Sequence, residues 1–271
     1  MYTDQIAPGY PRMPGSAQDM AGLRRVMDGY DTGILYADYL VGQLLDLLKE
    51  QGLYEDTAIF ITSDHGENMG ELAIYSEHGT ADYPTCHIPF IMKWPGCKAG
   101  SVDSGLHYSL DLLPTMASCW GGAWRSGRPK LRPNSHRGEG SRAGVPGALP
   151  DGPRVPALGA VWDWIYIRTL HDGYHLFDRE MLFNVKEDPH EQRNVKALHP
   201  EVCAQGAKLI LDWQEEQMLK SPSPVDPMYT VLHEGGPYHT RGHLQEYALR
   251  LEQTGRAQGA QELRRRHPNE P

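Results

Sequence analysis

The chain has 271 residues, of which 39% are hydrophobic, so it can bury a core in one large domain or two modest ones. Its formal net charge of -9 at pH 7 excludes the broad basic face that nucleic-acid binding needs. No apolar stretch is long enough to cross a bilayer, which argues against a membrane partner. Residues 1–15 are polar and rich in proline, so no signal peptide is expected and a cytoplasmic location is predicted.

The first predicted element is a helix that begins at Asp31 or Thr32 and continues to about Gln51. Apolar residues recur in it at three- and four-residue spacing, and Gly52 can end it. An irregular lead-in is expected before it, over residues 1–30.

Two apolar runs follow this helix. Residues 57–62 (TAIFIT) are continuously apolar and β-branched, which is typical of a strand covered on both faces, as in a parallel sheet. Residues 87–94 (HIPFIMKW) form a second such run, and residues 109–122 (SLDLLPTMASCWGG) predict a short helix. The order helix, strand, loop, strand, helix predicts an α/β core portion over residues 31–120.

The remaining chain divides into three predicted parts. Residues 121–156 are rich in Arg, Gly, Pro and Ala without any period, which predicts an irregular segment. Residues 157–220 predict a small antiparallel subdomain. Its first strand alternates up to a hairpin turn at Asp172-Gly173, residues 180–185 (EMLFNV) form another strand, and a helix follows.

That subdomain helix is expected to start at Pro200. The last part, residues 221–271, is a tail that ends in a charged amphipathic helix over about residues 242–266.

Asp64 and His65 follow the first predicted strand and are candidate metal ligands. Ligands of open α/β sheets gather at the carboxyl ends of strands, and carboxylate and imidazole groups commonly bind metals. Gly66 lets the backbone turn tightly beneath them. The alternative is an aspartate that caps the next loop beside an exposed histidine. Three glutamates of the same loop are expected to be solvated surface carboxylates: Glu67, Glu71 and Glu77.

The remaining cysteines and histidines indicate no further site. No two cysteines form a Cys-x-x-Cys pair, so buried free thiols are expected. They are Cys86, Cys97, Cys119 and Cys203. Three histidines near the end match no standard metal motif and are expected to be loop histidines: His233, His239 and His243.

Four segments in this order resemble the sulfatase family of the alkaline phosphatase-like superfamily: ITSDHGE, IPFIMKWPG, LDLLPT and MLFNVKEDPHEQRNV. The likeness covers about residues 33–219, except 121–160. It implies part of a three-layer α/β sheet fold with a small C-terminal subdomain. It also implies hydrolysis of sulfate esters of small molecules or carbohydrates. A phosphodiesterase or phosphonate hydrolase of the same superfamily is one alternative, and a non-catalytic pseudoenzyme remnant is another.

The resemblance also implies roles for three residues. Asp64 and His65 would be two ligands of a divalent cation, usually calcium in sulfatases, with magnesium, manganese and zinc as alternatives. Many sulfatases carry a lysine where this chain has His78. His78 is therefore the candidate catalytic contact to the sulfate or leaving-group oxygen, as a cation or general acid. The alternative is a loop histidine without catalytic weight.

Two parts of the family's machinery are missing from this sequence. The nucleophile is a formylglycine made from a Cys/Ser-x-Pro-x-Arg motif, and further metal ligands include an early Asp-Asp pair; the sequence contains neither. We therefore expect Asp64 and His65 to be the second half of a site, with little or no activity in the chain alone. An apolar sheet edge and face should be exposed where the first half would pack. A further hypothesis is that residues 121–156 are translated in a shifted frame.

Overall fold

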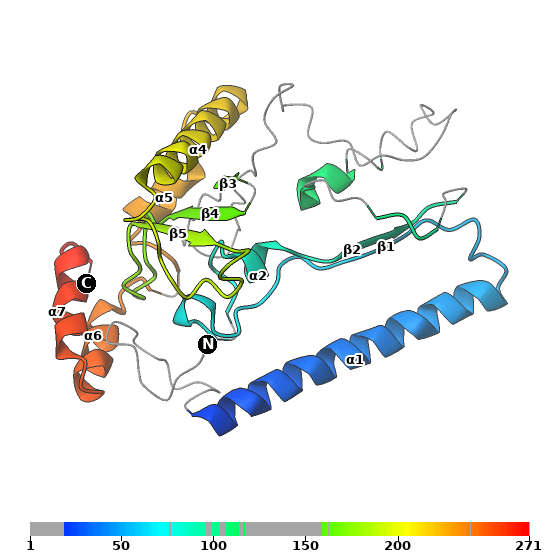
Figure 1. The fold of residues 1–271 in the computed structure, drawn as a ribbon, viewed down its shortest axis with the longest axis horizontal. Coiled ribbons are helices and arrows are strands. Elements are labelled where there is room, and N and C mark those ends of the chain that lie inside the picture. Colours follow the sequence, from blue (N-terminus) through cyan, green and yellow to red (C-terminus); the bar gives the residue numbers. More distant parts are fainter. Residues whose placement is uncertain are drawn as a thin grey trace. The chain divides into compact units, whose positions relative to one another are not determined.

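The computed structural model describes residues 19–75, 77–95, 99–102, 107–113, 116, 159–161, 163–238 and 240–270 (Figure 1). The irregular segment expected at residues 121–156, with the hypothesis of a shifted frame, lies outside the described residues. The chain forms two units. One comprises Met1–Asp28, His65–His87 and Ala143–Pro271, and the other comprises Gly29–Asp64 and Ile88–Arg142. The division of the chain into five parts predicted from the sequence stays a prediction.

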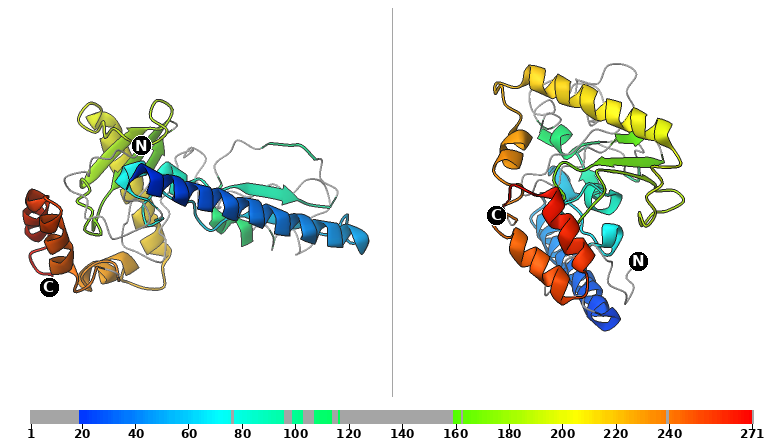
Figure 2. Two further views of the ribbon diagram at one scale, coloured as in Figure 1. Left: turned by 90° about the horizontal axis from the view of Figure 1, so that it is seen from below. Right: turned by 90° about the vertical axis from the view of Figure 1, so that its left-hand side faces the viewer.

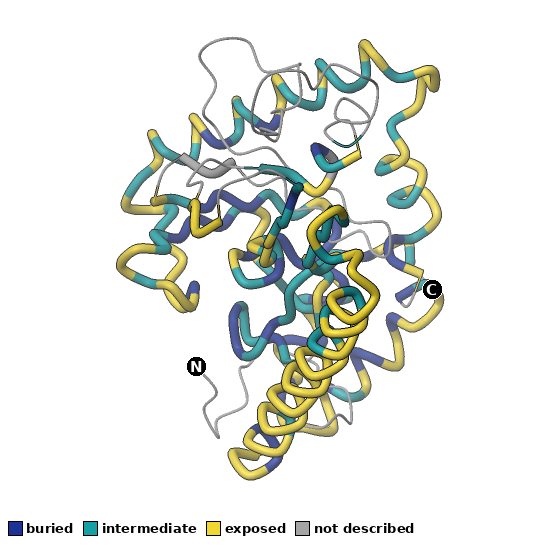
Figure 3. The backbone as a smooth tube through the Cα atoms, turned by 90° about the vertical axis from the view of Figure 1, so that its right-hand side faces the viewer, coloured by how far each residue is buried: buried dark blue, intermediate teal, exposed yellow. Residues whose placement is uncertain are grey.

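Helix α1 (Met20–Glu50) begins well before the predicted start at Asp31, so the irregular lead-in is wrong for residues 20–30. The side chain of Asp19 explains the early start, because its Oδ1 accepts a hydrogen bond from Gly22 N at 2.6 Å. Most of α1 is exposed (Figure 3). Its exposed residues include apolar ones such as Leu35, with 70% of its surface accessible.

Strands β1 (Ile59–Thr62) and β2 (Phe90–Lys93) pair antiparallel. The interpretation of these runs as strands of a parallel sheet covered on both faces is therefore wrong. Within the described residues they form a two-stranded sheet, and Ile91 is 60% exposed. Phe60 packs edge-on against the buried Trp94, with ring centroids 5.9 Å apart. Ile91 is an exposed apolar side chain of this sheet, and the expected exposure of a whole apolar edge and face stays a prediction.

The short helix expected at residues 109–122 is described at its beginning. It starts with the 3-10 turn η2 (Ser109–Asp111), and helical backbone continues through residues 112–113. The buried carboxylate of Asp111 closes this first turn by accepting a hydrogen bond from Tyr108 N at 3.0 Å.

The expected antiparallel subdomain is present as a three-stranded sheet in the order β3 (Gly159–Val161), β4 (Trp164–Arg168), β5 (Glu180–Asn184). Helix α4 (Pro200–Lys220) starts at the predicted proline and covers one face of the sheet. Tyr166, Leu182 and Ile210 form the core there. Gly206 is required on α4, because a Cβ at this position would lie 2.5 Å from the Tyr166 ring. A second cluster fills the opposite face: Ile165, Ile167, Met181 and Phe183.

The predicted turn at Asp172-Gly173 exists, and it lies in the loop of residues 169–179 that joins β4 to its antiparallel partner β5. The connection is long, so the two strands do not meet directly at this turn; Arg168 lies opposite Glu180. The turn instead folds the intervening loop, where Tyr174 has a left-handed φ of 66°. The Oδ1 of Asp172 stabilises this conformation by accepting a hydrogen bond from Tyr174 N at 2.9 Å.

The single amphipathic helix predicted over residues 242–266 is in fact two helices. Helix α6 (Leu244–Gln253) and helix α7 (Ala257–Arg266) pack side by side (Figure 2). Gly255 separates them with a φ of 76°, which a residue with a Cβ adopts at a cost. A further helix, α5 (Pro227–His233), was not predicted, although Asp226-Pro227 is a helix-start signal. No described helix is long and apolar enough to cross a membrane.

Candidate functional site

The loop that contains the candidate site, residues 65–87, is built around one buried carboxylate. It holds the short turn η1 (Glu71–Ala73) and the short helix α2 (Tyr83–Cys86). Asp82 is fully buried, and its Oδ2 accepts from Asn68 Nδ2 at 2.7 Å and from Thr85 Oγ1 at 2.9 Å. Its Oδ1 accepts from Thr80 Oγ1. These bonds close the loop around Asp82, because both carboxylate oxygens have donors.

Gly66 has a steric role beside α2. Its N–H donates to Thr85 O at 2.8 Å, and a Cβ at this position would lie 1.9 Å from Pro84 O. The glycine of the Asp-His-Gly motif is therefore required by the close approach of the α2 backbone, in addition to any turn it permits.

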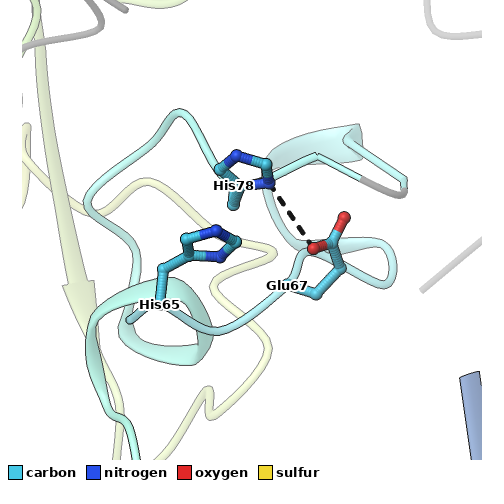
Figure 4. Close-up of side chains that lie close together, drawn as sticks. All are labelled: His65, Glu67 and His78. Carbon is cyan, nitrogen blue, oxygen red and sulfur yellow. Dashed lines mark ion pairs between the residues drawn. The ribbon is translucent and has the colours of Figure 1, made fainter. Parts of the chain in front are cut away.

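Figure 4 shows His65, Glu67 and His78 close together. The rings of His65 and His78 stack with centroids 3.7 Å apart and an interplanar angle of 15°. His65 Nδ1 lies 2.8 Å from Gly66 O, and a carbonyl can only accept, so Nδ1 carries the proton. The lone pair of this imidazole is therefore on Nε2, the arrangement that a metal-ligating histidine needs.

His78 is paired with an acid that was expected to be solvated. Its Nδ1 lies 3.6 Å from Glu67 Oε2, and the Glu67 side chain is only 19% exposed. The expectation of a solvated carboxylate is therefore wrong for Glu67. It is also wrong for Glu71, which is 7% exposed and accepts a hydrogen bond from Met69 N at 2.9 Å.

Asp64 directly precedes His65 and is exposed. It is the last residue of its segment in one unit, and His65 is the first residue of the next segment in the other. The roles of Asp64 and His65 as metal ligands, and of His78 as a catalytic contact, stay predictions.

Residues that sequence reasoning did not single out fasten this loop to the antiparallel subdomain. Glu191 is 2% exposed, and its Oε1 accepts from Tyr83 N at the start of α2 at 2.8 Å. Burial and the nearby Asp82 and Glu71 carboxylates raise the pKa of Glu191 to about 9. A second link joins His190 Nδ1 to Glu71 Oε1 at 3.1 Å. Glu191 belongs to the segment DPHEQRNV, which the sequence analysis singled out for its resemblance. The sequence alone does not show which residue this glutamate contacts.

Cys86 and Cys203 are free thiols, as expected, and both are partly buried. Burial and the neighbouring Asp82 and Glu191 carboxylates raise the pKa of Cys86 to about 12. A thiol that stays protonated is a poor nucleophile, so Cys86 does not replace the missing formylglycine. Cys97 and Cys119 lie outside the described residues.

A second cluster of possible metal-binding side chains lies away from this loop. It comprises His171, His267 and Glu270, and both histidines are buried. The sequence analysis had considered His233, His239 and His243 instead. His233 and His243 belong to neither donor cluster found among the described residues, and His239 lies outside them.

Known proteins resemble this chain both in sequence and in fold. The model of the family described as Sulfatase matches residues 2–122. This part of the chain, a little under half of its length, therefore resembles the sulfatase family.

Two curated relatives extend the match. Multifunctional alkaline phosphatase superfamily protein PehA from Trinickia caryophylli is 31% identical over 110 residues, covering 40% of this chain and 21% of the relative. N-acetylglucosamine-6-O-sulfatase from Bacteroides thetaiotaomicron is 28% identical over 230 residues, covering 78% of this chain and 39% of the relative. The chain thus spans well under half the length of these relatives.

A solved structure confirms the fold class. The crystal structure of a candidate sulfatase from Bacteroides thetaiotaomicron aligns with a TM-score of 0.57 and 20% identity, covering 76% of this chain and 46% of that one. The sulfatase-like α/β fold predicted from the sequence is therefore confirmed.

Proposed function

We propose that this chain carries the C-terminal part of a metal-assisted sulfatase site that hydrolyses sulfate esters. Asp64 and His65 are assigned as ligands of a divalent cation, and His78 as the contact to the sulfate or the leaving-group oxygen. The observation that carries the proposal is the arrangement of His65. Its Nδ1 proton is held by Gly66 O at 2.8 Å, and its ring lies against His78.

A carboxylate and an imidazole suit a divalent cation, and the donor atoms that converge in the loop are those of His65, Glu67 and His78. Asp64 offers an exposed carboxylate directly before an imidazole whose lone pair is on Nε2. A bound cation would supply positive charge opposite the sulfate oxygens. Calcium is the first choice because the family usually uses it, and magnesium, manganese and zinc are the alternatives.

His78 can hold a proton for a substrate oxygen. Its side chain is 46% exposed, so solvent and an ester can reach it, and Glu67 Oε2 stands 3.6 Å from Nδ1. With Nδ1 facing that carboxylate, Nε2 is the atom that can give a proton or a hydrogen bond to a sulfate or leaving-group oxygen. This is the role that the family's lysine fills with a fixed charge.

The chain alone is expected to turn over slowly or not at all. Sulfate ester hydrolysis needs an activated nucleophile and fixed charge around the sulfate, and the sequence lacks the formylglycine motif and the Asp-Asp pair. The substrate class is a sulfated small molecule or carbohydrate. The relative named N-acetylglucosamine-6-O-sulfatase supports the carbohydrate. A cytoplasmic location stays a prediction.

A phosphodiesterase or phosphonate hydrolase of the same superfamily is the second candidate. It is favoured by the match to PehA, whose name places it in the alkaline phosphatase superfamily without restricting it to sulfate. A non-catalytic remnant is the third. These candidates differ in whether the chain binds a cation and in which ester it hydrolyses.

Calorimetric titration with calcium tests the metal assignment. Asp64→Asn and His65→Ala should each weaken binding at least tenfold, whereas His190→Ala, which removes an exposed histidine beside the same loop, should leave it unchanged. Binding that survives both Asp64→Asn and His65→Ala would refute the assignment. An assay of aryl sulfate and phosphate diesters with the same protein separates the two hydrolase candidates. Clear turnover by the chain alone would contradict the expected inactivity.

A further inference from the structure

His267, just after α7, lies between two carboxylates. Its Nε2 is 3.0 Å from Asp172 Oδ1, and its Nδ1 is 2.7 Å from Glu270 Oε1. An ionised carboxylate can only accept hydrogen bonds, so both ring nitrogens must donate. The geometry therefore requires the doubly protonated, positively charged imidazole at His267.

The two carboxylates are held by further donors. Glu270 also accepts from Tyr174 OH at 2.6 Å and faces His171 Nε2 at 3.2 Å. Asp172 also accepts from Arg266 NH1 at 3.2 Å. Asp172, His171 and Tyr174 are buried, so these interactions are shielded from solvent screening. We call Asp172, His267 and Glu270 the C-terminal clasp.

The same cluster could in principle bind zinc, because two imidazoles and a carboxylate are within reach of one ion. The protonation of His171 argues against this. Its Nδ1 accepts from Gly173 N at 3.0 Å, so its proton is on Nε2, the atom that faces Glu270. The space is also filled, since a Cβ on Gly236 would lie 2.3 Å from His171 Nε2. Hydrogen bonds therefore explain the contacts of this cluster without a metal ion.

We propose that the C-terminal clasp is a proton-dependent lock, in which the charge on His267 fastens α6 and α7 to the turn at residues 171–177, and loss of that proton releases them. The lock joins segments almost a hundred residues apart in the sequence. Beside the clasp, apolar side chains of α6 and α7 also pack against Tyr174, so the charged contact adds to an apolar one: Leu244, Tyr247, Ala248, Leu251, Ala260 and Leu263.

The balance of forces on the clasp gives the direction of its pH dependence. Burial opposes a charge on His267, but the Asp172 and Glu270 carboxylates outweigh it and raise its pKa from 6.5 to about 9. Burial also opposes the charge on each acid. A hydrogen bond from His267 still holds the pKa of Asp172 below its usual value, and hydrogen bonds from His171 and His267 do the same for the pKa of Glu270. Burial and Glu270 raise the pKa of Tyr174, so its phenol stays protonated.

Because the folded pKa of His267 lies above the unfolded one, its stabilisation is complete below about pH 6.5. It declines as the pH rises and is lost above about pH 9. The lock should therefore open on the alkaline side.

Hydrogen exchange of the full chain, corrected for the intrinsic rate at each pH, tests this. Amides of α7 should lose at least tenfold of their protection between pH 7 and pH 9.5. In His267→Gln, which cannot carry the charge, α7 should be weakly protected at both pH values. The matched control is His243→Gln. It removes an exposed histidine whose Nδ1 lies 3.1 Å from Glu246 Oε2, three residues further along the chain. It should follow the unchanged protein.

Two results would overturn the lock. One is protection of α7 that does not change over this pH range in the unchanged protein. The other is protection that a chelator abolishes and zinc restores, which would assign the cluster to a metal. If His267→Gln fails to fold, Glu270→Gln serves in its place. It removes one of the two negative charges that stabilise the proton on His267, so the α7 amides should lose their protection at a lower pH. A pH midpoint of this loss equal to that of the unchanged protein would also refute the proposal.

Discussion

The loop at residues 65–87 and the sheet of β1 and β2 are adjacent in sequence but are stabilised in different ways. In the loop, the buried carboxylates of Asp82 and Glu191 accept hydrogen bonds that close it and fasten it. The two strands are almost entirely apolar, yet Ile91 remains 60% exposed. A segment that satisfies its own polar groups can hold its shape within this chain. An apolar strand gains little until another layer covers it.

This difference bears on the candidate site. His65 and His78 are brought together within one unit, by a loop that hydrogen bonds at Asp82 and Glu191 support. Substitutions at these bonds therefore act directly on this part of the site. Predictions that act on the loop should be large, and those that act on the strands should be small.

The largest effect is expected from the buried acid that fastens the loop. The folded pKa of Glu191, about 9, lies above its unfolded value of 4.5, so it favours folding below pH 4.5 and loses that contribution as the pH rises to 9. Stability of this unit should fall by a few kcal/mol across that range. In Glu191→Gln the amide can still accept from Tyr83 N but cannot ionise, so the decline should be much shallower. Urea unfolding at pH 5, 7 and 9 measures this.

The control for this change is His190→Gln, which alters the neighbouring residue on the same segment. The His190 side chain is 66% exposed, so its contact with Glu71 contributes little to stability. The stability of His190→Gln should therefore depend on pH as that of the unchanged protein does. A Glu191→Gln profile as steep as the unchanged one would show that another group governs the dependence.

A smaller effect on stability is expected from glycine-to-alanine substitutions, which should act in opposite directions in the loop and in α1. Gly66→Ala places a methyl group against Pro84 O and should destabilise the loop by about 2–3 kcal/mol. Gly33→Ala lies in α1 with nothing within 4 Å, so it should stabilise that helix by about 0.5–1 kcal/mol. Opposite signs in thermal unfolding would support the comparison. A neutral Gly66→Ala would mean that α2 can move away from the motif.

The sequence predicted helices and strands best where a local signal is enough to define the element. The helix from Pro200 and the strand at residues 180–185 were found because a proline start and a short apolar run have simple physical causes. The two apolar runs were predicted as strands of the kind found in a parallel sheet, but β1 and β2 pair antiparallel. A continuous apolar run indicates that both faces can be buried, and it carries no information on which strand lies beside it.

The candidate site was predicted only in part for a related reason. Asp64, His65 and His78 were singled out by resemblance, and the loop does bring two of them together. Glu191 and the clasp residues His267 and Glu270 were missed, because their roles depend on contacts between segments far apart in the sequence. Such contacts leave no local period, so neither spacing nor composition could identify them.

The smallest expected effect is on the exposed strand. Ile91→Thr keeps a β-branched side chain at a position that is 60% exposed, so the free energy of unfolding should change by less than about 0.5 kcal/mol. The same change removes apolar surface from the sheet, so the protein should stay dispersed at higher concentration in light scattering. Ile165→Thr, in a buried position of β4, is the matched control and should cost about 2 kcal/mol or more. A large loss of stability from Ile91→Thr would mean that this face is covered in solution, so that the apolar strands are stabilised as firmly as the loop.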